Sequence, residues 1–159
     1  MKMNTDNQLW NEICFILHDS IKPDINEKDF ESQVIRAIEK LGWLEYEKGI
    51  KRQPVLKLGR NIQVRPDLVM YGPKGNAFGV IEVKRPVEDL TKKESTEQLI
   101  SYMLQLKAKF GLLIGKNIRI YYDGKHNIQQ KPVLLESIDF ERDSEGGSKI
   151  GRASCRERV

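Results

Sequence analysis

Three ionisable residues lie on two short apolar segments at a spacing that can bring them together. Asp67 interrupts an apolar stretch at residues 65–69, and Glu82 and Lys84 end the next apolar segment fifteen residues later. In a strand, residues two apart project to the same face, so Glu82 and Lys84 lie side by side. A turn at residues 72–76 would fold the two segments into a hairpin and bring Asp67 to this pair.

Two neighbouring carboxylates repel each other unless a hard divalent cation joins them. Mg²⁺ is usually held by one or two carboxylates together with water and phosphate oxygens. The Lys84 ammonium could orient a water that attacks a phosphate, and it could balance the charge at that phosphate. The alternative is an ordinary surface pair of Glu82 and Lys84, with Asp67 at the end of a strand.

A carboxylate also lies on the apolar face of a predicted helix. Asn26 can cap this helix, which stops at Gly42, and its apolar residues form one stripe. They are Phe30, Val34, Ile35, Ile38 and Leu41. Glu31 falls inside this buried arc, where an unpaired charge is costly and needs a partner or a metal. The alternative is a half-exposed Glu31 that the helix dipole favours.

Two polar residues and a basic segment are candidates for contact with a substrate. Gln98 and Tyr102 are spaced i and i+4 on a helix predicted over 92–109, so they share one face beside the apolar stripe. The stretch from Lys48 to Arg65 contains six basic residues and no acidic one. They are Lys48, Lys51, Arg52, Lys57, Arg60 and Arg65. These residues could follow a phosphate backbone, or they could solvate an exposed hairpin.

The elements that must position these residues alternate between helices and strands. A first helix ends before Pro23, and the helix of Glu31 follows it. Strands are predicted at 43–58 and 62–71 around a turn at 59–61, then at 77–83. The helix over 92–109 precedes a hairpin of 112–114 and 118–122. This order predicts an α/β fold with a central mixed β-sheet flanked by helices.

Composition excludes several classes of protein. The chain has 159 residues, 39% hydrophobic and 31% charged, which suits one domain with its own core. It has two cysteines and no apolar run of the roughly 18 residues that span a membrane. A secreted disulfide scaffold, a zinc finger and a membrane protein are therefore excluded, and a cytoplasmic location is expected. The segment 111–117 lacks the spacing of a phosphate-binding loop, so no ATP site is expected.

The last ten residues are expected to be foreign to the protein. Residues 150–159 correspond to one reading frame of a common short-read sequencing adapter. Removing them leaves 24 basic and 22 acidic residues, so the net charge falls from +4 to +2. The expected organisation is an N-terminal helix at 1–25, a domain with the candidate site residues at 26–148, and an artefact at 149–159 that follows a truncated C-terminus.

Residues 26–125 together resemble the PD-(D/E)xK nuclease superfamily. Its pattern is a helix Glu, a Pro-Asp, a Glu-x-Lys and then a helix, which corresponds to Glu31, Asp67, Glu82 and Lys84. The segment from Gln98 to Tyr102 is similar to the Gln-x-x-x-Tyr motif of its restriction and recombination branches. Within the superfamily, the resemblance is to the N-terminal nuclease domain of type I restriction enzyme R subunits.

This resemblance implies a restriction-endonuclease-like core and Mg²⁺-dependent cleavage of DNA, with Mn²⁺ as an alternative cation. It implies that Asp67 and Glu82 are metal ligands, that Lys84 lies beside the water, and that Glu31 supports the metal or its waters. Gln98 and Tyr102 would position DNA. Further implied partners are a helicase/translocase region after the truncation and methylation and specificity subunits. A catalytically silent DNA-binding module and a recombination-type exonuclease stay open as alternatives.

Overall fold

The computed structural model describes residues 5–57, 59–60, 63–124 and 131–156, without the side chains of residues 5–6 and 151–156. Its helices are α1 (Thr5–Cys14), the π-helical turn η1 (Phe15–Asp19), α2 (Glu27–Lys40), α3 (Lys93–Leu106) and α4 (Glu145–Arg156). Its strands are β1 (Ile50–Arg52), β2 (Leu56–Lys57), β3 (Gln63–Val64), β4 (Leu68–Tyr71), β5 (Ala77–Val83), β6 (Phe110–Ile114), β7 (Asn117–Tyr122) and β8 (Val133–Asp139).

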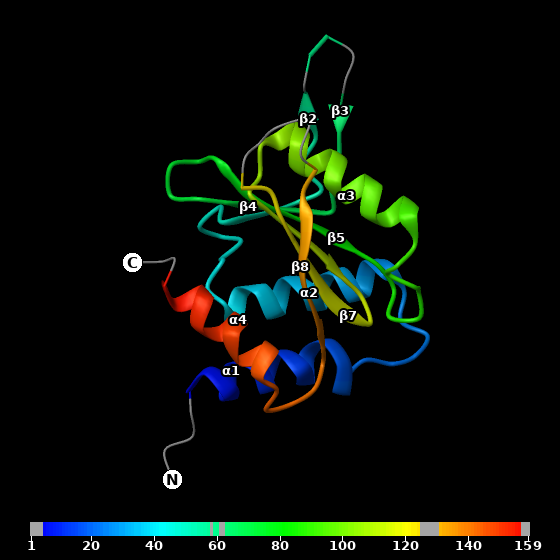
Figure 1. The fold of residues 1–159 in the computed structure, drawn as a ribbon, viewed down its shortest axis with the longest axis vertical. Coiled ribbons are helices and arrows are strands. Elements are labelled where there is room, and N and C mark those ends of the chain that lie inside the picture. Colours follow the sequence, from blue (N-terminus) through cyan, green and yellow to red (C-terminus); the bar gives the residue numbers. More distant parts are fainter. Residues whose placement is uncertain (1–4, 58, 61–62, 125–130, 157–159) are drawn as a thin grey trace.

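Six of the strands form one mixed sheet. Their order is β1-β4-β5-β6-β7-β8, with β5 and β6 parallel and the other neighbours antiparallel. α3 makes the crossover between β5 and β6 that a parallel pair requires. β2 and β3 pair only with each other, and this β2–β3 hairpin projects from the body of the molecule (Figure 1). The predicted mixed sheet with flanking helices is thus confirmed.

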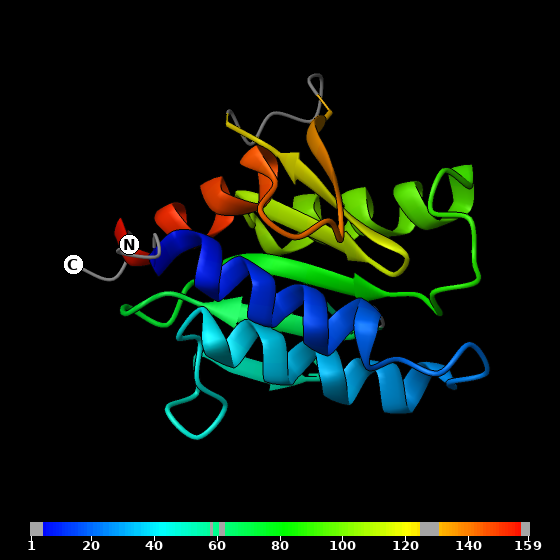
Figure 2. The ribbon, with the colours of Figure 1, turned by 90° about the horizontal axis from the view of Figure 1, so that it is seen from below.

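The helices divide between the two faces of the sheet. α3 covers one face, where a small core contains Val80, Leu99, Met103 and Leu113. α1, η1 and α2 cover the other face, where the larger core includes Trp10 and Phe30. Figure 2 shows α1 and α2 on one side of the sheet and α3 on the other. Among the described helices, none has the length and apolar character needed to cross a membrane.

α2 forms as its sequence predicts. The Asn26 side chain accepts a hydrogen bond from the Asp29 N–H at 2.8 Å, which caps the first turn. Leu41 ends the helix, and Gly42 follows with a φ of 93°, a conformation that glycine adopts without strain. The predicted apolar stripe is confirmed because Phe30 and Val34 are fully buried.

Three parts of the sequence differ from their predicted structure. Residues 43–49 form a turn and no strand, because the N–H groups of Lys48 and Gly49 bond back to Glu45 and Leu44. The sequence analysis also does not predict β8 or α4. β8 is an edge strand whose first three residues are exposed, so it lacks the alternation that marks a half-buried strand. Residues 58, 61 and 62, at the predicted turn and strand boundary, lie outside the described residues.

α4 packs on α1 through a glycine. A Cβ atom at Gly147 would overlap the indole ring of Trp10, which is itself fully buried. Trp10 also donates a hydrogen bond from Nε1 to the Glu141 carbonyl at 2.8 Å. The expected foreign origin of residues 150–159 stays a prediction, and the side chains of 151–159 lie outside the described residues.

Gly147→Val is expected to destabilise the protein because the added side chain must displace the Trp10 ring. Overpacking of this kind costs about 1–3 kcal/mol. At the neighbouring Gly146 a Cβ would meet only ordinary contacts, the nearest being Glu136 Oε1 at 3.4 Å. Gly146→Ala is the matched control and should preserve or raise stability by roughly 0.5–1 kcal/mol. Urea unfolding measures both variants, and equal stability of the two would contradict this account of α4 packing.

Candidate active site

The β4–β5 hairpin brings Asp67 and Glu82 into contact. The register pairs Leu68 with Ile81, which places Asp67 next to Glu82 on the adjoining strand. The Asp67 N–H donates to Glu82 Oε1 at 3.1 Å, and the Val83 N–H donates to Asp67 Oδ2 at 2.8 Å. Each carboxylate is therefore held by a backbone donor of the other strand.

Burial makes this pair of carboxylates hard to ionise. Glu82 is 3% exposed, and desolvation together with the nearby Asp67 charge raises its pKa to about 8. Desolvation also raises the pKa of Asp67, although the Val83 N–H and the Lys84 charge oppose that rise. A cation that reaches this pair would be attracted to it, because the positive charge would stabilise the ionised carboxylates.

Lys84 places its charge beside the two carboxylates. It follows the last residue of β5, and its backbone N–H donates to the Ile114 carbonyl at 2.9 Å, which extends the β5–β6 ladder by one residue. Lys84 comes two residues after Glu82, so the alternation of a strand places both side chains on the same face, and the Lys84 charge lowers the pKa of both Asp67 and Glu82. The side chain is half-buried, which leaves it open to a substrate.

Glu31 reaches the same region from α2. It is 6% exposed, as the helical pattern predicts. Desolvation is the largest cause that raises the pKa of Glu31, and the charge of Asp67 raises it further. Gln53 and Arg52 oppose this rise. The charge of Asp67 therefore acts on Glu31 across the boundary between the helix layer and the sheet.

Glu27 is a neighbour of the site that the sequence analysis does not identify. Its pKa is raised by burial and by the charge of Asp67, and is lowered by Lys84. Glu27 lies four residues before Glu31 and thus on the same face of α2, which is the sequence signal that could have indicated it.

Gln98 and Tyr102 lie together on α3. Gln98 Nε2 donates to Tyr102 Oη at 3.2 Å, as their i and i+4 spacing allows. Gln98 is exposed and Tyr102 is half-buried against the smaller core. In the described part of the chain, no hydrogen bond or ion pair joins them to the carboxylates of the site. Their role in DNA positioning stays a prediction.

The basic residues between β1 and β3 separate into two groups. Arg52 Nε pairs with Glu45 Oε2 at 3.2 Å, and Lys51 Nζ lies over the Tyr71 ring at 5.1 Å. Lys57 and Arg60 instead line a polar hollow of about 460 Å³ on the β2–β3 hairpin. This hairpin connects the end of β1 to the start of β4, so it leaves the sheet at the end that carries Asp67.

The carboxylates present suit Mg²⁺, although they do not form a complete cage. Within the described residues, no three His, Cys, Asp or Glu side chains gather closely enough to hold a metal ion. Glu31, Asp67 and Glu82 are thus not one close group. Asp67 and Glu82 still supply the one or two carboxylates that Mg²⁺ usually takes from a protein.

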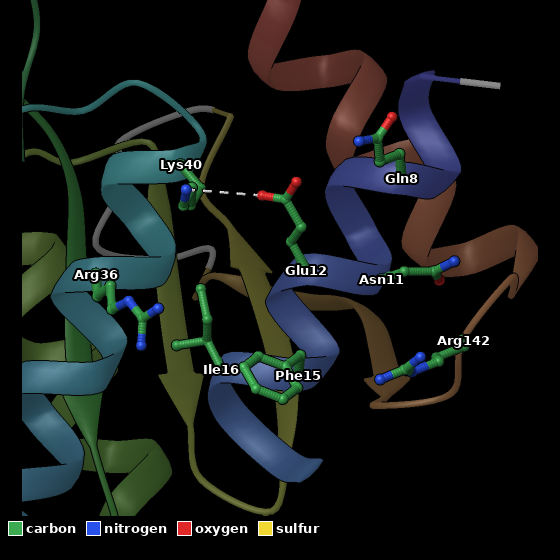
Figure 3. A pocket seen from close by; sticks show the side chains of 8 residues that line it. All are labelled: Gln8, Asn11, Glu12, Phe15, Ile16, Arg36, Lys40 and Arg142. Carbon is green, nitrogen blue, oxygen red and sulfur yellow. Dashed lines mark ion pairs between the residues drawn. The ribbon is translucent and has the colours of Figure 1, made fainter. Parts of the chain in front are cut away.

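A separate groove lies between α1 and α2 and contains none of the predicted site residues. It has a volume of about 460 Å³ and is lined by Gln8, Asn11, Glu12, Phe15, Ile16, Arg36, Lys40 and Arg142 (Figure 3). Lys40 Nζ pairs with Glu12 Oε2 at 3.8 Å across this groove. The candidate site is separate from this groove and is defined by Asp67, which comes just before β4, and Glu82 of β5.

Comparison with known proteins supports the fold. No known protein family matches the sequence, and no curated protein matches it either. The structure is similar to part of a chain in a cryo-electron-microscopy structure of a DrdV–DNA complex. The TM-score is 0.56 at 15% sequence identity, over 94% of this chain and 13% of that chain. The predicted fold class, a mixed sheet flanked by helices in a restriction-endonuclease-like core, is confirmed.

Proposed function

We propose that this chain is a Mg²⁺-dependent DNA endonuclease domain of the PD-(D/E)xK superfamily. It would belong to a type I restriction enzyme R subunit or to a stand-alone relative. The observation that carries the proposal is the buried contact between Asp67 and Glu82, with Lys84 beside it. Burial of two carboxylates side by side suits a cation, because a bound cation would offset their mutual repulsion and favour the ionised form, and the Lys84 ammonium next to them suits a phosphate.

Each side chain has a distinct role in this proposal. Asp67 and Glu82 would hold Mg²⁺, which when bound activates water and stabilises negative charge on the phosphate. Lys84 would orient the attacking water, because its ammonium lies beside both carboxylates. Glu31, which is buried on α2, would accept hydrogen bonds from water at the site.

DNA is the proposed substrate. The similar chain comes from a complex with DNA, and Lys57 and Arg60 lie on a hairpin at the same sheet end as Asp67. The chain spans only 13% of the length of that similar chain. The resemblance to type I restriction enzyme R subunits suggests a translocase region and methylation and specificity subunits as further proposed partners.

Incubation of duplex DNA with the protein and Mg²⁺ tests the proposal, with EDTA and the Asp67→Asn variant as the comparisons. Cleavage that requires both Mg²⁺ and Asp67 is the expected result. Binding of DNA without cleavage would contradict the enzymatic assignment and would leave a silent DNA-binding module.

The β2–β3 hairpin is expected to carry part of the salt dependence of DNA binding. Each neutralised phosphate contributes roughly −0.9 to the slope of log K against log salt on duplex DNA. Replacing both Lys57 and Arg60 with Ala should therefore flatten that slope by roughly 1.8. Fluorescence anisotropy at several salt concentrations measures it.

The matched control removes two positive charges at the other end of the sheet. Lys74 lies in the turn that leads into β5, and Lys107 follows α3, at the end opposite Asp67. Replacing both with Ala should leave the slope near that of the wild type. An equal change in the two double variants would mean that net charge acts and that the hairpin does not contact DNA.

A further inference from the structure

Gly115 lies in the turn between β6 and β7, next to the main chain of Lys84. A Cβ atom at Gly115 would lie 3.1 Å from the Lys84 carbonyl oxygen and 3.5 Å from the Arg85 carbonyl oxygen. It would also lie 3.0 Å from Leu90 Cδ2. Non-bonded carbon atoms pack best about 3.5–4.0 Å apart, and the two shorter contacts are tighter than a side chain usually makes. The absence of a Cβ atom therefore lets this turn approach Lys84 closely.

The backbone conformation does not explain why residue 115 is a glycine. The glycines with a positive φ are Gly42, Gly59 and Gly75, and Gly115 is not among them. An alanine could therefore adopt the φ of Gly115 without strain. What excludes a side chain at this position is the space that the Lys84 carbonyl and its neighbours occupy.

Hydrogen bonds on two sides keep the Lys84 main chain from moving away from an added side chain. The Lys84 N–H donates to the Ile114 carbonyl at 2.9 Å, on the strand that leads into the turn. The next residue, Arg85, donates from its N–H to Glu88 Oε2 at 2.8 Å and from Nε to the Ile25 carbonyl at 3.2 Å. The segment of Lys84 and Arg85 is thus fixed where it passes the turn.

We infer that Gly115 is a positioning residue that holds Lys84 beside Asp67 and Glu82. This inference rests on the proposed function, in which the Lys84 ammonium orients the attacking water. Without a side chain at Gly115, the β6–β7 turn packs directly against the Lys84 main chain, and the hydrogen bond to Ile114 maintains that contact. The turn therefore sets the position from which the Lys84 side chain extends.

Gly115→Ala tests the inference because it adds a single Cβ atom at this contact. The added atom must displace its neighbours by a few tenths of an ångström. A misplacement of about 1 Å can cost roughly 100-fold in rate, so a kcat lower by roughly 10-fold is expected. The KM for DNA and the Mg²⁺ affinity measured by calorimetry should not change, because Asp67 and Glu82 are held by bonds that do not involve Gly115.

Amide hydrogen exchange gives a second readout that does not require cleavage. The Lys84 N–H should exchange roughly 10-fold faster in Gly115→Ala, because the displacement weakens its bond to Ile114. The reference is the Tyr71 N–H, which donates to the Gly49 carbonyl at 2.9 Å near the turn of the β4–β5 hairpin. The ratio of the Lys84 rate to the Tyr71 rate separates a local change from a loss of global stability.

Gly111→Ala is the matched control for added volume on the same strand. A Cβ atom at Gly111 would overlap Met103 Sδ in the smaller core. Gly111 pairs with Val80, which lies four residues before Lys84 along β5. This variant should lower the urea midpoint of unfolding and keep the kcat and the exchange ratio of the wild type.

Leu90→Val separates the two short contacts at Gly115. Valine has no Cδ2 atom, so in Gly115→Ala/Leu90→Val the contact with Leu90 is relieved and the contact with the Lys84 oxygen remains. The kcat of this double variant should stay roughly 10-fold below that of Leu90→Val alone. The same comparison replaces the single variant if Gly115→Ala does not fold.

Several results would overturn the inference. One is a wild-type kcat in Gly115→Ala, and another is an equal fall in Gly111→Ala, since loss of stability would then explain both. Recovery of kcat in the double variant would assign the effect to Leu90, and weaker Mg²⁺ binding by Gly115→Ala would assign it to the acidic pair. If the wild type does not cleave DNA, the proposed function fails and the exchange ratio decides: a higher ratio in Gly115→Ala supports the placement of Lys84 by Gly115. An unchanged ratio overturns the inference in either case.

Discussion

DNA cleavage by the Asp67→Asn and Glu82→Gln variants is expected to be at least about 10³-fold slower than cleavage by the wild type. Either change removes a negative oxygen that Mg²⁺ requires. A bound metal contributes several kcal/mol of transition-state stabilisation, and about 4 kcal/mol corresponds to roughly 10³-fold in rate. Single-turnover cleavage of a plasmid at saturating Mg²⁺ measures the loss.

The amide variants should keep their fold, which makes the result interpretable. Both hydrogen bonds of the pair are accepted by a side-chain oxygen, and an amide retains one such oxygen. Glu39→Gln, on α2 away from the pair, is the control for loss of one carboxylate and should cleave at the wild-type rate. Cleavage by Asp67→Asn and Glu82→Gln at that same rate would remove the metal site from the proposal.

Lys84→Met separates the chemical step from metal binding. It removes the ammonium beside the carboxylates and keeps a side chain of similar length. Mg²⁺ binding measured by calorimetry should persist in this variant, while kcat falls. Loss of both would mean that Lys84 acts by supporting the carboxylate pair and not by orienting water.

The central part of the fold and the acidic pair are visible in the sequence because local patterns determine them. The apolar segment before Lys84 can be read as a strand without tertiary information, and residues 72–76 form a recognisable turn. Together they place Asp67 beside Glu82. The burial of Glu31 is also predictable. Successive residues of a helix are turned by a fixed angle, and this angle puts Glu31 on the apolar face.

Gln53 and β8 are not predictable in this way. Gln53 has a φ of 40°, and the residues that it hydrogen-bonds, Asp67 and Arg65, lie twelve or more residues away in the sequence. β8 gains its strand conformation from pairing with β7, and its exposed Val133, Leu134 and Leu135 give no alternating pattern. Local composition carries neither signal, because both depend on contacts that exist only in the folded chain.

The basic segment shows the same limit at the level of charge. Six positive residues look like one continuous surface in the sequence. In the structure Arg52 is neutralised by Glu45, whereas Lys57 and Arg60 lie on a hairpin that leaves the sheet near Asp67. Spacing along a chain does not indicate which charges find a partner. The salt experiment therefore tests the predicted DNA contact of the basic segment at the β2–β3 hairpin alone.

The free energy of unfolding of the metal-free wild type is expected to fall as the pH rises from about 4.5 to about 8. The pKa of Glu82 is about 8 in the folded protein, against an ordinary value of 4.5 that applies to the unfolded chain. Between these values the folded protein keeps a proton that the unfolded chain has lost. Stability therefore decreases with pH in this window, and the contribution of protonated Glu82 is lost as the pH passes about 8.

Glu82→Gln should remove this dependence, because an amide does not ionise. The variant should resemble the wild type near pH 4.5 and exceed it at pH 8.5 by a few kcal/mol. The raised pKa values of Asp67 and Glu31 give a decline of the same sign, which remains in both proteins. Urea unfolding with EDTA across this pH range measures the difference, and Glu39→Gln is the matched control.

Mg²⁺ should restore the stability of the wild type at high pH and leave the stability of Glu82→Gln nearly unchanged. Ions that bind the folded state stabilise it by mass action, and ionised carboxylates bind Mg²⁺ more tightly than protonated ones. Curves of the wild type and Glu82→Gln that stay parallel from pH 4.5 to pH 8.5 would contradict the raised pKa of Glu82. Equal stabilisation of both proteins by Mg²⁺ would show that the ion binds elsewhere. The same acidic pair that weakens the metal-free protein at high pH is, on this account, what gives the cation its binding energy.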